Sequence, residues 1–190
     1  MQYSLSFMIM NRSRIEILAH PIRLRIVGAF SKARATVEEI KRMLPDVPQA
    51  TLYRQVQLLI DEGVLRIVGH HRARGGPQRI LSLAEGGGLI PDSEWNSANA
   101  AELERILTAF IASMLGNART YLGFSGNRGP DPGVACRGQV FFATDAEACE
   151  LRDRVHRLLA EAADRPQLFG ARRWRASFFS VPIEPAGRAA

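Results

Sequence analysis

One stretch of the chain carries side chains whose hydrogen-bonding groups match the edges of DNA bases. Arginine can donate two hydrogen bonds to guanine, and glutamine can pair with adenine. Threonine and tyrosine hydroxyls can bind phosphate oxygens, and a small residue allows a helix to approach a groove closely. The candidate DNA-contacting residues of this stretch are Gln49, Ala50, Thr51, Tyr53, Arg54 and Gln57. Because any amphipathic helix has a polar face, these residues alone are also compatible with an ordinary solvated surface.

Apolar residues in the same stretch indicate the helix that would carry this polar face. They recur at spacings of three and four, which is the period of an amphipathic helix; they are Leu52, Val56, Leu59 and Ile60. We expect the helix to begin at Pro48 or Gln49. It should end at Gly63, because glycine takes the left-handed conformation that terminates helices.

Two shorter helical segments precede this helix and would position it. Apolar periodicity predicts a helix over residues 14–31 with a break near Ala19–Pro21, since proline bends a helix or starts a new one. Thr36–Glu39 forms a capping box that begins a second helix at about 37–44. Prolines in Leu44–Pro48 then enforce a turn. A short helix, a tight turn and a polar-faced helix, in this order, favour a DNA-reading role.

A basic hairpin follows the third helix. Val64–Val68 and Arg79–Leu83 are rich in branched aliphatic residues and are predicted to be strands, and Gly69–Gln78 is predicted to be a long tip. Such a tip can follow a phosphate backbone or enter a minor groove. The residues expected to contact DNA from this hairpin are His71, Arg72, Arg74 and Arg79.

The net charge of +6 is unevenly distributed along the chain. Residues 1–86 contain thirteen basic and seven acidic residues, whereas residues 87–190 contain twelve of each. This asymmetry indicates that the first half meets a polyanion, with a solvated basic face as the alternative.

Four segments of the first half carry a family resemblance. Ile17–Val27, Gln49–Val56, Asp61–Leu65 and Arg72–Gly76, in this order and spacing, resemble the ArsR-like winged-helix regulators. The resemblance covers about residues 14–84. It implies a homodimer on a pseudo-palindromic operator, with the helix at 49–62 in the major groove and the hairpin, or wing, beside it.

The chain departs from the metal-sensing members of this family in the second-helix region. Val37–Met43 contains no cysteine or histidine, although those members carry a cysteine-bearing stretch there. Structural metal sites also use closely spaced ligand pairs, which Cys136, Cys149 and His156 do not form. The adjacent His70 and His71 would point to opposite faces of a strand. We therefore expect no metal and a resemblance to the branch whose second domain has another role.

The second half is predicted to contain a linker and a separate module. Residues 87–94 are rich in glycine and proline and are interpreted as a linker. A long helix is expected over residues 99–122, with a broad apolar stripe that packs against a second copy of the chain or within its own chain. The stripe consists of Leu103, Ile106, Leu107, Phe110, Ile111, Met114 and Leu115.

The last third of the chain is predicted to form a small α/β layer. Residues 139–143 and 172–181 are predicted to be strands, and Thr144 and Glu147 form a capping box for a helix that extends to about Ala163. This helix is expected to bury Leu151, Val155, Leu158 and Leu159. The large side chains that could line an apolar effector pocket, or belong to an ordinary core, are Trp95, Phe110, Met114, Phe142, Trp174 and Phe178.

These patterns lead to one interpretation of the chain. We predict an α+β protein with a winged helix-turn-helix DNA-binding domain at 1–86 and a dimerisation and possible effector-binding domain at 95–190. The expected function is sequence-specific transcriptional regulation by a homodimer on double-stranded DNA, with or without a small-molecule effector. The first alternative is a winged-helix scaffold that binds another protein, and the second is an RNA-binding or enzymatic role.

Other function classes lack support in the sequence. No phosphate-binding loop, dinucleotide fingerprint or nucleophile elbow is found, so an enzyme is not expected and no cofactor is predicted. Apolar runs are far shorter than the roughly 20 residues that cross a bilayer, and no secretory signal is recognised. A cytoplasmic location without membrane partners is therefore expected.

Overall fold

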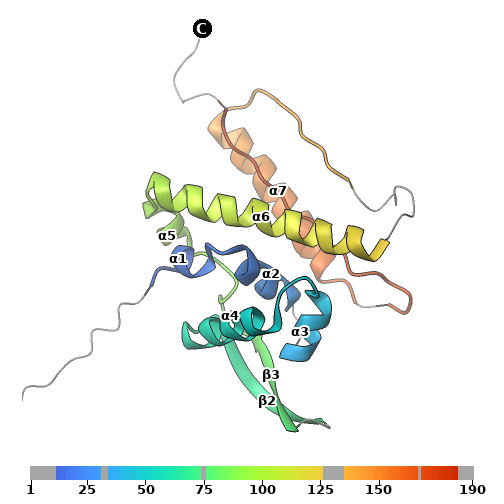
Figure 1. Ribbon diagram of the computed structural model, residues 1–190. Coiled ribbons are helices and arrows are strands. Elements are labelled where there is room, and N and C mark those ends of the chain that lie inside the picture. Colours follow the sequence, from blue (N-terminus) through green and yellow to red (C-terminus); the bar gives the residue numbers. More distant parts are fainter. Residues whose placement is uncertain (1–11, 31–33, 74–75, 126–134, 167, 184–190) are drawn as a thin grey trace, which may run out of the picture. The chain divides into compact units, whose positions relative to one another are not determined.

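The computed structural model describes residues 12–30, 34–73, 76–125, 135–166 and 168–183. The chain divides into two compact units, Met1–Asn127 and Arg128–Ala190. Figure 1 shows the helices and strands with the labels used below.

The first two helices are separated at the proline that the sequence singles out. Helix α1 spans Arg14–Leu18 and helix α2 spans Pro21–Ala29. His20 caps α2 because its Nδ1 accepts the N–H of Ile22 at 3.2 Å, and Pro21 occupies the first helical position, where an N–H is not needed. The predicted break is confirmed.

Helices α3 and α4 form a helix-turn-helix. Helix α3 (Val37–Met43) starts at the predicted capping box, in which the Glu39 N–H donates to the Thr36 hydroxyl at 3.3 Å and the Thr36 N–H donates to the Glu39 carboxylate at 2.7 Å. Helix α4 spans Gln49–Asp61. Gly63 follows it with a φ of 66°, a left-handed conformation that few other residues adopt without strain.

Three antiparallel strands complete the winged fold in the order β1-β3-β2. They are β1 (Ala35–Thr36), β2 (Leu65–Ala73) and β3 (Gly76–Leu83). The two strands of the hairpin are longer than predicted, because pairing continues through His71 with Gln78 and Arg72 with Pro77. Most of the predicted tip at Gly69–Gln78 is therefore paired strand.

The core of the first unit lies between the apolar faces of its helices and the inner face of the sheet. Those helix faces arise from apolar residues spaced three and four apart. Its fully buried large side chains include Leu18, Ile26, Phe30, Ile40, Leu52, Val56, Leu59, Leu65 and Leu81. The third-helix stripe is confirmed, with Ile60 only partly buried. Burial of these side chains fixes α4 with its polar face outward.

The segment interpreted as a linker is instead packed into the first unit. A Cβ at Gly87 would lie 2.3 Å from the carbonyl oxygen of Val64, so only glycine fits this turn. Beyond it, helix α5 (Asp92–Ser97) places the Glu94 carboxylate on the first amide of α1, 2.5 Å from the Arg14 nitrogen. The structural division falls after Asn127, not at 87–94.

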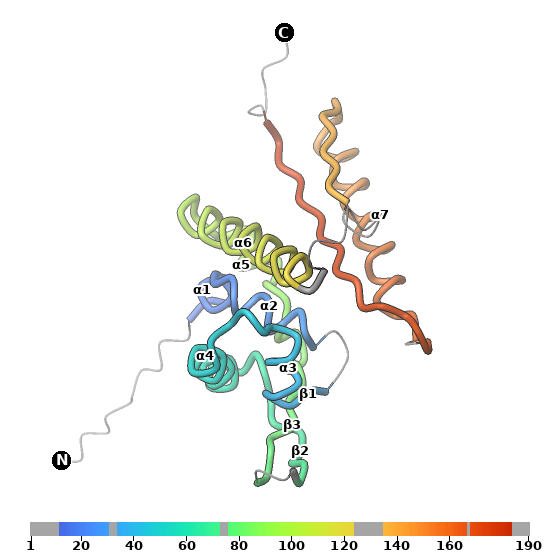
Figure 2. The backbone as a smooth tube through the Cα atoms, turned by 45° about the vertical axis from the view of Figure 1, so that its right-hand side comes forward, coloured from blue at the N-terminus to red at the C-terminus, as the bar shows by residue number. Residues whose placement is uncertain are grey.

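Helix α6 (Ala100–Ser125) also belongs to the first unit. It lies across α1 and α2 on the side away from the hairpin (Figures 1 and 2). Ile106, Ala109 and Ser113 of α6 are buried on the face that packs against the rest of the unit. On a different face of the helix Ile111 and Leu115 are each 49% exposed, so only part of the predicted apolar stripe is buried within the chain.

The second unit contains helix α7 (Asp145–Ala163), which begins at the predicted capping box of Thr144 and Glu147. The expected strands at 139–143 and 172–181 are wrong, because no ladder of backbone hydrogen bonds pairs either segment in the described residues. An extended segment becomes a strand only with a hydrogen-bonded neighbour. The expected burial is also absent. Leu151 and Leu158 are exposed, while Val155 and Leu159 are only partly buried.

Among the described residues, no helix combines the length and the apolar character that crossing a bilayer requires.

Candidate nucleic-acid interface

Helix α4 and the β2–β3 hairpin lie on the side of the first unit away from α6 (Figure 2). Five of the six predicted contact residues on α4 are exposed and Thr51 is partly exposed. The five are Gln49, Ala50, Tyr53, Arg54 and Gln57. No side chain caps the start of α4 at Pro48, so its first amides point outward with the positive end of the helix dipole.

Three of these side chains are already bonded within the chain. The Lys41 ammonium donates to Gln49 Oε1 at 2.6 Å, and the Tyr53 hydroxyl donates to Glu38 Oε1 at 3.0 Å. Both bonds connect α4 to the preceding helix. Burial and the Glu38 carboxylate raise the pKa of Tyr53 above its usual value of 10.0, so its hydroxyl is a neutral donor at physiological pH.

Gln57 is held by both ends of its amide. Its Nε2 donates to Asp61 at 2.8 Å, and its Oε1 accepts from Arg79 of β3 at 3.1 Å. The second bond connects the wing directly to α4. It fixes the position of the hairpin relative to the exposed helix face, which the sequence pattern does not indicate.

Arg54 is the exposed residue of this face with the most available hydrogen-bonding groups. In the described part of the chain its guanidinium forms no hydrogen bond or ion pair, and all its donors remain available to a ligand. Burial and the charges of Arg23 and Arg54 lower the pKa of His20 below its usual value of 6.5. His20, at the start of α2, therefore lies within range of the charges of both Arg23 and Arg54.

His20 and Arg23 are candidate contacts that sequence reasoning missed. Pro21 was interpreted only as a break in the helix, and His20 only as part of the segment that carries the family resemblance, although a proline at the start of a helix already indicates an amide-rich helix end. Arg23 adds a positive charge near the N-terminus of α2, whereas the lowered pKa of His20 favours its neutral form.

The wing presents a second group of basic residues. His71 and Arg72 are exposed on β2, and Arg79 on β3 is partly buried by its bond to Gln57. Arg74, also predicted to contact DNA, lies outside the described residues. The described wing residues therefore provide an exposed cation at Arg72 near the tip of the hairpin.

The six predicted effector-pocket residues are divided between the two units, three in each. Trp95, Phe110 and Met114 belong to the first unit, where Trp95 is 41% exposed. In the second unit Phe142 is 98% exposed and Trp174 is 63% exposed with the Arg172 guanidinium over its ring. Phe178 is half-buried against His156, at a ring separation of 6.4 Å.

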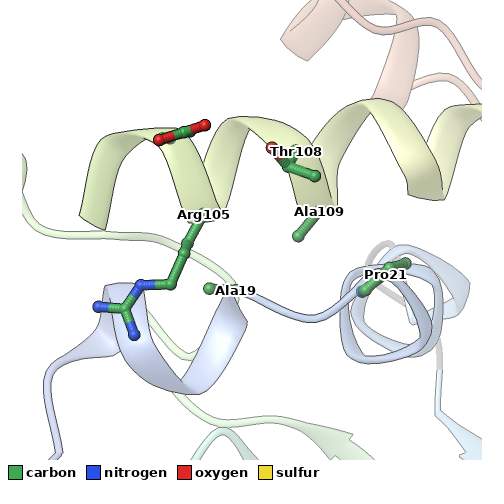
Figure 3. Close-up of a pocket in the computed structure, with 6 residues that line it drawn as sticks. Ala19, Pro21, Arg105, Thr108 and Ala109 are labelled. Atoms are coloured by element: carbon green, nitrogen blue, oxygen red, sulfur yellow. The ribbon is translucent and has the colours of Figure 1, made fainter. Parts of the chain in front are cut away.

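A hollow in the first unit has different walls. It lies between the α1–α2 corner and α6, has a volume of about 270 Å³ and is open to solvent (Figure 3). Its lining residues are Ala19, Pro21, Glu104, Arg105, Thr108 and Ala109. None of the six predicted residues is among them.

The sequence of the helix-turn-helix region was compared with known families. Residues 18–68 match the family model of a helix-turn-helix domain. The match extends from the end of α1 into β2 and includes the whole polar face of α4. Helix-turn-helix domains place their second helix in the major groove of DNA, and α4 is the second helix of this pair. No curated protein matches the chain.

Proposed function

We propose that the chain is a sequence-specific DNA-binding transcriptional regulator that acts as a homodimer on a pseudo-palindromic operator. The proposal rests on one observation: the helix-turn-helix match coincides with an α4 face on which Arg54 is exposed and unpaired. A guanidinium of this kind can bind the O6 and N7 atoms of guanine with two donors.

The contacts within the chain suggest different roles for the residues of this surface. Gln49, Tyr53 and Gln57 are oriented by neighbours before any ligand arrives, which lowers the entropy lost on binding. Arg54 would read a base in the major groove. Arg72 would bind phosphates from the wing, in a manner independent of sequence.

Dimerisation is proposed from the exposed apolar side chains of α6. Ile111 and Leu115 are each 49% exposed, and Leu122 is 56% exposed, at spacings that place them along one face of the helix. A second copy packed on this face would bury it and would bring two α4 helices to one duplex. Half-sites about one helical turn apart require such a linked pair of readers.

The mechanism would be occlusion of a promoter or recruitment of the transcription machinery. A protein-interaction scaffold is the competing function. The two differ in their dependence on salt, because every phosphate that the protein neutralises releases counterions from the duplex. Association that is insensitive to salt would indicate the scaffold.

Arg72→Ala tests the phosphate-binding role of the wing. We expect affinity to fall by a similar factor for all duplexes, and the slope of log K against log salt to become shallower by about 1. Fluorescence anisotropy with duplexes of two unrelated sequences, at several salt concentrations, measures both quantities.

Arg105→Ala is the matched control, because it removes the same charge from an exposed position on α6, the helix on the side of the first unit away from the hairpin. Its slope should equal that of the wild type. An unchanged slope for Arg72→Ala would remove the wing from the interface.

A further inference from the structure

A polar cluster connects α2, α6 and the turn that precedes α4. At its centre is Arg25 of α2, which is only 5% exposed. Its two terminal nitrogens donate to the two carboxylate oxygens of Asp46, each at 2.7 Å. This two-pronged geometry restrains both the distance and the orientation of the turn relative to α2.

Helix α6 contributes the other half of the cluster. Arg25 Nε donates to Asn117 Oδ1 at 3.1 Å, and Nη2 donates to the Thr120 hydroxyl at 2.8 Å. The Thr120 oxygen also lies 2.8 Å from Asp46 Oδ1 and 3.1 Å from the Gly116 carbonyl oxygen, and it donates its single proton to one of them. One turn and two helices thus share a single guanidinium.

Gly116 allows α6 to approach this closely. A Cβ at this position would lie 3.0 Å from Arg25 Nη1 and 3.2 Å from its Cζ, which is closer than nearly all real contacts. The guanidinium occupies the space that any other side chain would take. Glycine in the interior of a helix normally destabilises it, so its presence here fits a requirement for close packing.

The cluster is charged under physiological conditions. Hydrogen bonds from the Arg25 guanidinium hold the pKa of Asp46 at about 2, below its usual value of 3.8, although the Asp46 side chain is 42% exposed. Removal of Asp46 would leave the buried Arg25 guanidinium without its opposite charge. The charges of Arg25 and Asp46 therefore stabilise the arrangement of the cluster.

Asp46 lies only two residues before Pro48, whose carbonyl oxygen accepts the first helical bond of α4 from Leu52 at 2.9 Å. The cluster thus connects α6 to the start of α4 by a route separate from the apolar core. Apolar packing is non-directional and tolerates small shifts, whereas these hydrogen bonds are directional.

We infer that Arg25, Asp46, Asn117 and Thr120 are positioning residues that fix the first turn of α4 relative to α6. The inference rests on the proposed function, because in a dimer joined through α6 this angle sets the distance between the two α4 helices. The cluster consequently selects the spacing of operator half-sites. A force that displaces α6 is transmitted to α4 through Asp46.

Thr120→Val tests the cluster because valine keeps the shape of threonine and removes the hydroxyl. Amide hydrogen exchange of the full chain without DNA should accelerate about tenfold in residues 46–52, as expected for a lost bond to a charged group. Affinities for duplexes whose half-sites differ by one base pair in spacing should become more alike. Thr120→Ser, which keeps the hydroxyl, should restore both properties.

Thr108→Val is the matched control, because Thr108 is exposed on the same helix and lies outside the cluster. Gly116→Ala is an independent probe. It raises helix propensity but should accelerate exchange in residues 46–52, because its Cβ displaces the Arg25 guanidinium.

The possible outcomes separate this inference from the proposed function. If the wild type binds no duplex, both the proposed function and the role of the cluster in half-site spacing fail. The exchange experiment does not depend on DNA and still tests whether the cluster fixes the first turn of α4. Uniform acceleration of exchange over the first unit in Thr120→Val would refute the positioning role. If the wild type does bind duplexes, an unchanged preference for half-site spacing in Thr120→Val would refute it as well.

Discussion

Arg54→Ala should lower the affinity for the operator by about 1–3 kcal/mol and relax the preference at one base pair of each half-site. Arg54 is exposed on α4 and has no hydrogen-bonding partner within the described part of the chain, so its loss removes ligand contacts and leaves the fold intact. Titration of the variant against an operator duplex and single-base-pair variants of that duplex measures both effects.

Arg105→Ala provides the control for Arg54→Ala. Arg105 is exposed on α6, the helix on the side of the first unit away from the hairpin, and its removal changes net charge by the same amount. This control should keep the base preference of the wild type. An identical base preference in Arg54→Ala would show that α4 does not read the sequence through this residue.

Glutamate at both Ile111 and Leu115 should convert the dimer to a monomer. Both side chains are half-exposed in the isolated chain, so the fold of the monomer should change little in stability. In the dimer, however, four carboxylates would be placed in an apolar interface. Because binding at two linked half-sites gains avidity, the affinity for an operator should fall by about 100-fold or more.

Sedimentation velocity distinguishes the dimer from the monomer directly. The Ala100→Glu, Ala101→Glu double variant serves as the control, because both residues are exposed in the first turn of α6 and their replacement adds the same charge. The control should sediment as the wild type does. A dimer that persists in the Ile111→Glu, Leu115→Glu double variant would place the interface elsewhere.

Local sequence signals were sufficient to predict the helix-turn-helix region. The capping box at Thr36, the proline at position 21 and the glycine at position 63 each act through the nearest few residues, and each appears in the structure as expected. The apolar stripe of α4 follows from helical period alone, so the exposed position of Arg54 could be predicted as well.

Long-range packing could not be predicted from the same signals. The glycines near position 87 are typical of a linker by composition, but Gly87 is required because a carbonyl group of Val64 approaches it. On α6 the spacing of the leucine and isoleucine residues predicted a broad apolar stripe but no polar contact. The buried partners Asn117 and Thr120 are polar, and nothing in their spacing points to Arg25.

Side-chain pairing at the interface and strand pairing in the second unit also depend on distant residues. Gln57 is oriented by Arg79 from another element, so helical period could show its exposure but not its bonds. Residues 139–143 and 172–181 have the composition of strands. Strand formation needs a neighbouring backbone, which a single-segment pattern does not specify.

Selection of duplexes from a random pool by the folded wild-type protein, followed by sequencing, tests the role of α4 as a DNA reader most directly. Recovered duplexes should share two inverted half-sites about 10 base pairs apart, centre to centre, each with a conserved guanine that Arg54→Ala no longer selects. Recovery of a pool with the same sequence distribution as the input would contradict sequence-specific binding by this surface.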